Sequence, residues 1–161
     1  SDCHDAHQLD LDPASCKTCH GVEDPGVIRM NSKGDYDGDG NVEEGLKAEL
    51  EGVQEVLLKA IQGYATSVAQ KPILYSPASY PYVFNDMNAN GTLDADEATP
   101  ANQYKSFTPR LMQAMYNYHY IVKDPGAYTH NGVYALQAMY DSVESLNAKA
   151  PVEGFDKLVR P

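Results

Sequence analysis

The residues best suited to chemistry in this chain are cysteines and histidines near its start. Cys16 and Cys19 are separated by two residues, and His20 directly follows the second cysteine. Two thiols at this spacing can each form a thioether with a haem vinyl group, and the adjoining histidine can bind the iron. A zinc site would need a second ligand pair of similar spacing, and a thioredoxin-like redox pair would follow a strand. The spacing therefore predicts one covalently attached c-type haem.

A second cysteine–histidine pair, Cys3 and His4, resembles the second half of another such motif. Three interpretations stay open: the sequence begins inside a longer haem-bearing chain, a single thioether holds a haem at Cys3, or Cys3 is an ordinary thiol. The first two interpretations predict a second haem close to the first.

Histidine number limits how these haems can be ligated. A six-coordinate iron needs two axial ligands, and His20 and His4 are the proximal candidates by motif. The distal candidates for two haems are His7, His119 and His130. One histidine is left over, which suggests that it reaches a haem in another domain or subunit.

Other roles for these ligands stay open. Each distal candidate can instead be an ordinary histidine that hydrogen-bonds a carbonyl group. Methionine ligation is the competing assignment, and its candidates are Met30, Met112 and Met115.

Two acidic stretches fit the spacing of calcium loops. In the first, residues 35–46, oxygen-bearing side chains alternate and a glycine follows the third acid. The twelfth position, where a bidentate glutamate is usual, is Leu46, so we nominate Glu44 to close the site. The alternative is a solvated acidic turn. The predicted ligands are Asp35, Asp37, Asp39, Asn41 and Glu44.

The second stretch, residues 86–97, fits the twelve-position calcium template throughout. Its flanks contain prolines and tyrosines instead of an amphipathic helix, so we expect structural calcium and not a calcium sensor. The predicted ligands are Asp86, Asn88, Asn90, Thr92 (through its carbonyl), Asp94 and Glu97.

The elements that must position these residues are mainly helical. Apolar residues at steps of three and four predict helices over 43–69, 108–123 and 131–147. Prolines and aromatic residues in 71–84 predict an extended connector, and we expect a loosely packed tail from Pro151. We expect a single haem-binding domain over 1–161, mainly α with little β. Its attachment segment is 1–34, and about three helices and long irregular loops pack around c-type haem.

Composition limits the partners and the location. The formal net charge of −11 disfavours nucleic acid and anionic membrane surfaces. No apolar run approaches the ~20 residues that span a bilayer. Because c-type haem is attached outside the cytoplasm, the motif implies export with removal of a signal, and hence a periplasmic or extracellular protein.

The chain resembles the C-terminal part of the large multihaem c-type cytochromes of metal-respiring bacteria. The stretches that carry this resemblance are "SDCHDAH", "SCKTCH", "DYDGDGN", "NDMNANGTLDADE" and "FTPRLMQAMYNYHYIVKDPGAYTHNGVYALQAMYDSVESL". The resemblance implies bis-histidine haems in chains and respiratory electron transfer. In some relatives a histidine of one subunit ligates a haem of the next within a filament. This chain has one complete attachment motif where the family has many.

Three functions follow from these observations. The leading one is electron transfer through bis-histidine haem, as one link in a relay with other haem domains or subunits or in a homo-oligomeric filament. The second is reduction of a small nitrogen or oxygen compound at a five-coordinate haem, with Tyr118 or Tyr120 nearby. The third is a calcium-dependent binding module.

Overall fold

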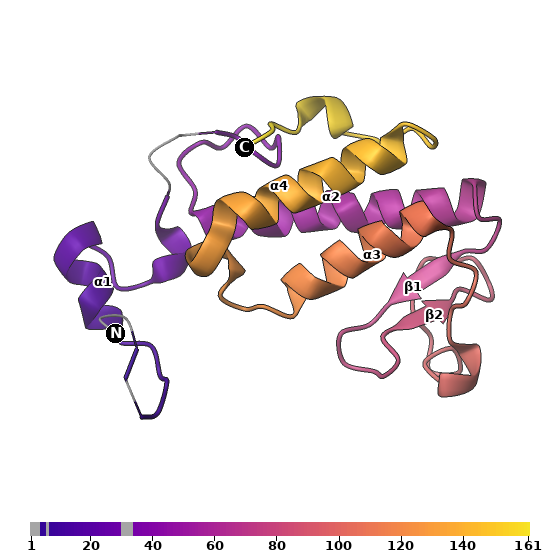
Figure 1. The fold of residues 1–161 in the computed structure, drawn as a ribbon, viewed down its shortest axis with the longest axis horizontal. Coiled ribbons are helices and arrows are strands. Elements are labelled where there is room, and N and C mark those ends of the chain that lie inside the picture. Colours follow the sequence, from indigo (N-terminus) through magenta and orange to yellow (C-terminus); the bar gives the residue numbers. More distant parts are fainter. Residues whose placement is uncertain (1–3, 6, 30–33) are drawn as a thin grey trace.

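The computed structural model describes residues 4–5, 7–29 and 34–161. Within these residues, three long helices form the main body, and α2 and α4 run in the direction opposite to α3 (Figure 1). The starts of α2 and α4 therefore lie at the same end as the end of α3. The elements, in chain order, are α1 (Pro13–His20), a 3₁₀ turn (Pro25–Val27), α2 (Leu46–Ser67), β1 (Ile73–Tyr75), β2 (Val83–Asn85), a 3₁₀ turn (Pro100–Asn102), α3 (Pro109–Val122), α4 (Ala127–Asn147) and a 3₁₀ turn (Phe155–Lys157).

Helix α2 confirms the longest predicted helix. Its apolar stripe is buried from Leu46 to Tyr64, because residues three or four apart share one helical face. Val68, which follows the last turn, is 40% exposed. The helix begins after its N-cap, Gly45, where a side chain would overlap the backbone of Gly26. This close approach seats the start of α2 against the 3₁₀ turn Pro25–Val27.

Helices α3 and α4 complete the bundle. Thr108 caps α3, and its hydroxyl oxygen accepts a hydrogen bond from the Leu111 N–H at 3.2 Å. Helix α4 begins four residues earlier than predicted and is interrupted at Asn131, whose φ of −158° and ψ of 57° are not helical. Val133, two residues after this interruption, is 47% exposed.

The hydrophobic core is made of side chains from the three long helices. Leu57, Leu111 and Leu146 are fully buried in it. No residue of α1, which carries the haem-attachment motif, is buried. The mainly helical fold is confirmed, and within the described residues the core is formed by side chains of the three long helices.

The connector and the tail are more ordered than the sequence suggests. Strands β1 and β2 pair antiparallel, with Ile73 opposite Asn85. The expected loose tail is wrong, because Leu158 is only 7% exposed and the Val159 N–H donates to the Tyr36 carbonyl oxygen at 3.2 Å. The C-terminal residues thus pack against the first acidic loop.

Helix α1 stands apart from the bundle at the end where α2 and α4 begin (Figure 1). Asp12 caps it by accepting hydrogen bonds from the Ala14 N–H at 3.1 Å and the Ser15 hydroxyl at 2.9 Å. Gly21 ends it with a φ of 74°, a left-handed conformation that glycine adopts without strain. No helix in the described parts of the chain is long and apolar enough to cross a membrane.

Candidate haem-binding site

The complete attachment motif lies on α1. Cys16 is half-buried and Cys19 is exposed, and neither forms a disulfide with another described residue. Residues three and four apart share one face of a helix, so α1 presents Cys16, Cys19 and His20 together. The structure therefore brings these three predicted residues onto one surface.

A cavity of about 210 Å³ lies beside His20. Its walls are largely apolar and include Ile28, Leu46 and Tyr128, which come from the N-terminal part, from α2 and from α4. An apolar wall next to an imidazole suits a flat porphyrin, so the residues present fit the predicted haem.

A second site is formed by His4 and His130, whose ring centroids are 6.4 Å apart with 44° between the ring planes. The Nδ1 atom of His4 lies 3.0 Å from the Leu9 carbonyl oxygen. The Nδ1 atom of His130 lies 3.7 Å from Oδ1 of Asp124. The structure therefore brings together two of the predicted haem ligands, His4 and His130.

This spacing can be tested against haem. An imidazole nitrogen binds a transition metal at about 2 Å, so rings on opposite faces of one iron have centroids roughly 6 Å apart. Rotation of each ring about its bond to iron allows the observed tilt. The observed centroid distance of 6.4 Å is close to this expected value.

The two sites share the first turn of α4. Tyr128 and Thr129 line the cavity of His20, and the next residue, His130, faces His4. The two candidate sites therefore adjoin each other at residues 128–130.

The remaining predicted haem residues lie elsewhere. Cys3 and Met30 are outside the described residues. The His7 side chain is exposed, and its backbone N–H donates to Asp5 Oδ1 at 2.9 Å. Backbone hydrogen bonds from Gln8 and His7 hold the pKa of Asp5 below its usual value.

The methionine and tyrosine candidates on α3 are not at either histidine site. Met115 is 4% exposed in the bundle core, and Met112 is 49% exposed. Tyr118 is buried and packs edge-on against Tyr75 at 5.0 Å, while Tyr120 is exposed and stacks beside Tyr116. Among the described residues, neither Met112 nor Met115 lies at a histidine site, whereas Tyr120 lines the cavity of His119.

His119 lies in a separate aromatic cluster. Its Nδ1 atom is 2.9 Å from the Tyr75 hydroxyl, and its ring lies 5.0 Å from that of Tyr82. Burial, together with the Lys123 cation, lowers the pKa of His119. Its ring lines an open cavity of about 280 Å³ that also reaches Asp124.

The second acidic loop follows β2 and has its end residues buried. Asp86 is 6% exposed, and its Oδ2 accepts from the Gly91 N–H at 2.8 Å. Glu97 is 1% exposed, and its Oε1 accepts from the Met87 N–H at 2.7 Å. The carboxylates at the first and twelfth positions of the loop, Asp86 and Glu97, therefore lie close together. The other predicted ligands lie at or near the surface: Asn88, Asn90, Thr92 and Asp94.

The first acidic loop repeats this pattern with a residue that sequence reasoning missed. Asp35 Oδ2 accepts from the Gly40 N–H at 2.9 Å, as in the second loop. The Tyr36 N–H donates to Glu49 Oε2 at 2.7 Å, so Glu49 takes the place of the closing glutamate. Glu49 comes from α2 and is fully buried. The sequence did contain a signal for this role, because Glu49 is a carboxylate on the apolar stripe of the predicted helix 43–69.

Ligand atoms in this loop form two groups within 4.8 Å: Asp35, Asp37 and Glu49, and Asp37, Asp39 and Glu44. Glu44 joins the cluster, but it does not close the loop alone. Its Oε1 is buried and has no hydrogen-bond partner among the described residues. Burial, with the nearby Asp39, Glu49 and Glu44 carboxylates, raises the pKa of Asp37 to about 6. Crowded carboxylates and an unpaired buried oxygen fit a cation.

Asn41, the remaining predicted ligand of the first loop, is exposed, and its amide nitrogen lies 3.4 Å from Glu44 Oε2.

Arg29 joins this loop to the N-terminal part of the chain. Its Nη1 lies 2.7 Å from Glu49 Oε1 in a buried ion pair, and Nη2 donates to the Gly34 carbonyl at 2.7 Å. Nη1 also donates to the Glu44 carbonyl. Arg29 also lines the cavity of His20, so one side chain touches both predicted sites.

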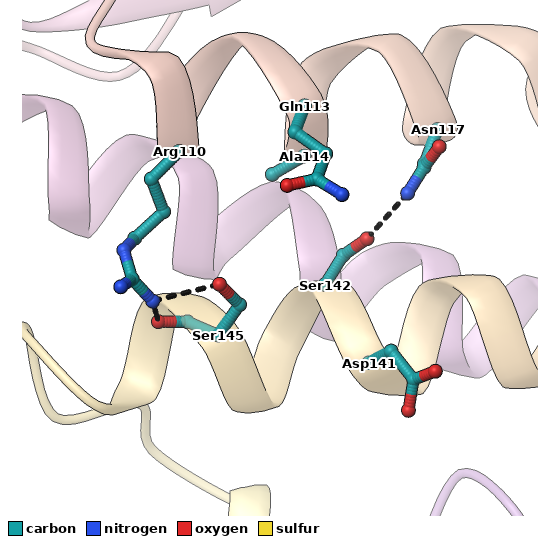
Figure 2. Close-up of a pocket in the computed structure, with 7 residues that line it drawn as sticks. All are labelled: Arg110, Gln113, Ala114, Asn117, Asp141, Ser142 and Ser145. Atoms are coloured by element: carbon teal, nitrogen blue, oxygen red, sulfur yellow. Dashed lines mark hydrogen bonds between the residues drawn. The ribbon is translucent and has the colours of Figure 1, made fainter.

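A small polar groove of about 80 Å³ lies between α3 and α4 (Figure 2). Arg110 donates to Ser145 Oγ at 2.7 Å, and the Asn117 amide donates to Ser142 Oγ at 2.9 Å. These polar groups hydrogen-bond each other across the helix interface and so stabilise the packing of α3 on α4.

Comparison with known proteins gives partial similarity to haem proteins of one organism. The C-type polyheme cytochrome OmcC of Geobacter sulfurreducens is 30% identical over 109 residues, covering 63% of this chain. OmcB, from two strains of the same species, is 29% identical over 109 residues with the same coverage. The chain spans 14% of the length of these relatives.

These similarities support a relationship to multihaem c-type cytochromes. No family model matches the chain. No solved structure matches it.

Proposed function

We propose that this chain transfers electrons through covalently bound c-type haem. The observation that carries the proposal is the facing pair of His4 and His130, whose 6.4 Å separation suits two axial ligands of one iron. The polyhaem cytochromes to which the chain is similar support the same function.

Two haems are proposed, each held by its own residues. Cys16 and Cys19 attach one haem and His20 ligates it, with the apolar cavity beside α1 receiving the ring. Cys3 attaches the other, between His4 and His130. Haem supplies a metal that changes charge by one electron, and the protein supplies ligands, a dielectric environment and distance. The shared first turn of α4 keeps the two haems close, which favours transfer between them.

His119 extends the relay outward. Tyr75 holds Nδ1 of His119, and the ring lines a cavity open at the surface. We propose that His119 ligates a haem of another domain or subunit, within an assembly that includes filaments. Such a chain would act in the periplasm or at the cell exterior, where c-type haem is attached, without nucleic acid as a partner.

The test of bis-histidine ligation is His130→Ala in the haem-loaded protein. We expect intact mass to show two haems per chain and the oxidised wild type to be entirely low-spin by electron paramagnetic resonance. In the variant, one of the two haems should become high-spin. Val133→Ala, an exposed change on the same helix, serves as the control. A low-spin His130→Ala protein, or a wild type with the bare polypeptide mass, would contradict the proposal.

We also propose one structural calcium ion in each acidic loop. In the second loop, Asp86, Asn88, Asn90, Thr92, Asp94 and Glu97 supply the oxygens. In the first, Asp35, Asp37, Asp39, Asn41 and Glu44 do so together with Glu49. The buried, unpaired Glu44 oxygen supports the first site, and the converging Asp86 and Glu97 carboxylates support the second.

Calcium removal tests this second proposal. Excess chelator should lower the melting temperature, because uncompensated carboxylates then repel each other. Glu97→Gln should reduce the calcium stoichiometry by one ion, whereas Glu153→Gln, an exposed change in the tail, should leave it unchanged. An identical melting curve in chelator and in calcium would rule out structural calcium.

A further inference from the structure

The carboxylate of Asp124 is fixed at the start of α4, next to the ring of His130. Its Oδ1 accepts a hydrogen bond from the Gly126 N–H at 2.9 Å, and its backbone carbonyl accepts one from the Ala127 N–H at 3.1 Å. The same Oδ1 lies 3.7 Å from Nδ1 of His130. Backbone N–H groups just before His130 therefore hold Asp124 in place beside the His130 ring.

Gly126 leaves room for that ring. A Cβ at this position would lie 2.8 Å from Nδ1 of His130 and would overlap the ring carbon beside it. The backbone there, with φ −101°, suits any residue, so the requirement for glycine is steric. Asp124 and Gly126 together form a seat for the imidazole.

The geometry points to Asp124 as a positioning residue that lowers the reduction potential of the haem held by His4 and His130. This inference rests on the function proposed above. At 3.7 Å the carboxylate is beyond hydrogen-bond distance from Nδ1, so it acts on the imidazole through its charge. A fixed negative charge near the iron also stabilises the oxidised, more positive state relative to the reduced state.

The neighbouring lysine does not cancel this charge. Lys123 directs its ammonium group to the Pro77 carbonyl oxygen at 2.9 Å, and the group lies 4.4 Å from the centre of the Tyr82 ring. Its charge thus points toward the connector between β1 and β2. Asp124 therefore places an uncancelled negative charge beside the ring of His130.

The test is Asp124→Asn in the haem-loaded chain, measured by spectroelectrochemical titration. Asparagine keeps an oxygen that can accept from the Gly126 N–H, so only the charge is lost. We expect the reduction equilibrium of one haem to shift about tenfold toward the reduced form, an increase of about 59 mV for a one-electron couple. The shifted haem should be the one that becomes high-spin in His130→Ala.

The matched control is Glu144→Gln, which removes one negative charge from an exposed position of the same helix. It lies 14 residues from His130, about 21 Å along the axis, beyond the screening length of about 8 Å at physiological salt. We expect no measurable shift in this variant. Asp124→Glu, which keeps the charge, should retain most of the wild-type potential.

The outcomes separate the two proposals. An unchanged potential in Asp124→Asn, with the low-spin signal intact, would overturn the role of Asp124 and leave haem ligation standing. A His130→Ala protein that stays low-spin would overturn the ligation itself. Gly126→Ala tests the steric requirement. The added methyl group should crowd the His130 ring and produce a high-spin fraction at one haem. A fully low-spin spectrum would show that Gly126 is not needed to make room for the ring.

Discussion

The helical bundle and the N-terminal segment (described residues of 4–29) are built on different physical principles. The bundle encloses side chains such as Leu57 and Leu136, which are almost completely buried. Helix α1 of the N-terminal segment has caps at both ends but no buried residue. The bundle is stabilised by burying its own apolar surface, and α1 gains little from burial.

This difference shows where the proposed cofactor matters. An isolated eight-residue helix is only marginally stable in water, whatever its caps. A haem bonded to Cys16 and Cys19 and packed in the cavity beside His20 would supply the missing apolar contact. The N-terminal segment is therefore expected to depend on haem, whereas the bundle is expected to fold without it.

The largest effect should come from preventing attachment at α1. In Cys16→Ala/Cys19→Ala, we expect one haem fewer per chain and cleavage of the N-terminal segment by a protease at least roughly tenfold faster than in the wild type. Helix α1 then lacks its apolar partner. Limited proteolysis with mass spectrometry measures both.

Thr18→Ala, on the same helix, is the control for this pair and should keep the haem and the slow cleavage. If the double variant loses the far-ultraviolet helical signal of the whole chain, the bundle depends on haem and the contrast between the two regions fails.

The next largest effect should appear at the joint between the two regions, the buried ion pair of Arg29 and Glu49. Glu49→Gln leaves the Arg29 charge buried without its partner, so we expect the free energy of unfolding to fall by about 3 kcal/mol. Chemical denaturation measures it. Glu51→Gln breaks an exposed pair with Lys47 on the same helix and should cost less than about 1 kcal/mol. Equal effects from the two variants would show that the buried Arg29–Glu49 pair contributes no more to stability than the exposed pair.

A cavity in the bundle should be nearly as costly. Leu57 is fully buried on α2, and Leu57→Ala should lower the free energy of unfolding by about 2–5 kcal/mol while leaving the haem count unchanged. Met112→Ala, at a 49% exposed position of α3, is the control and should change stability by less than about 0.5 kcal/mol. A small effect at Leu57 would mean that the bundle is not the stable region.

The smallest effect is expected at the cap of α3. Thr108→Ala removes the hydroxyl that accepts from the Leu111 N–H, so the free energy of unfolding should fall by about 1 kcal/mol. Thr108→Ser keeps a hydroxyl and should restore most of that loss. If serine fails to restore it, the cap is not the source of the effect.

Much of the fold could be predicted because helices depend on local patterns. Steps of three and four between apolar residues predicted α2 and α3. The start of α4 was missed because the interruption at Asn131 hides the periodicity there. The short helix α1 was missed because it has no apolar stripe, although Asp12-Pro13 before it is a usual start signal.

The sequence by itself determined the chemistry of this protein: the spacing of Cys16, Cys19 and His20, the twelve-residue acidic loop and the supply of histidines. Those features are local, so adjacency along the chain is enough to recognise them. Only the tertiary structure decided which distant residues meet. His130 faces His4, and Glu49 closes the first acidic loop, because helix packing brings together groups whose separation along the chain carries no signal.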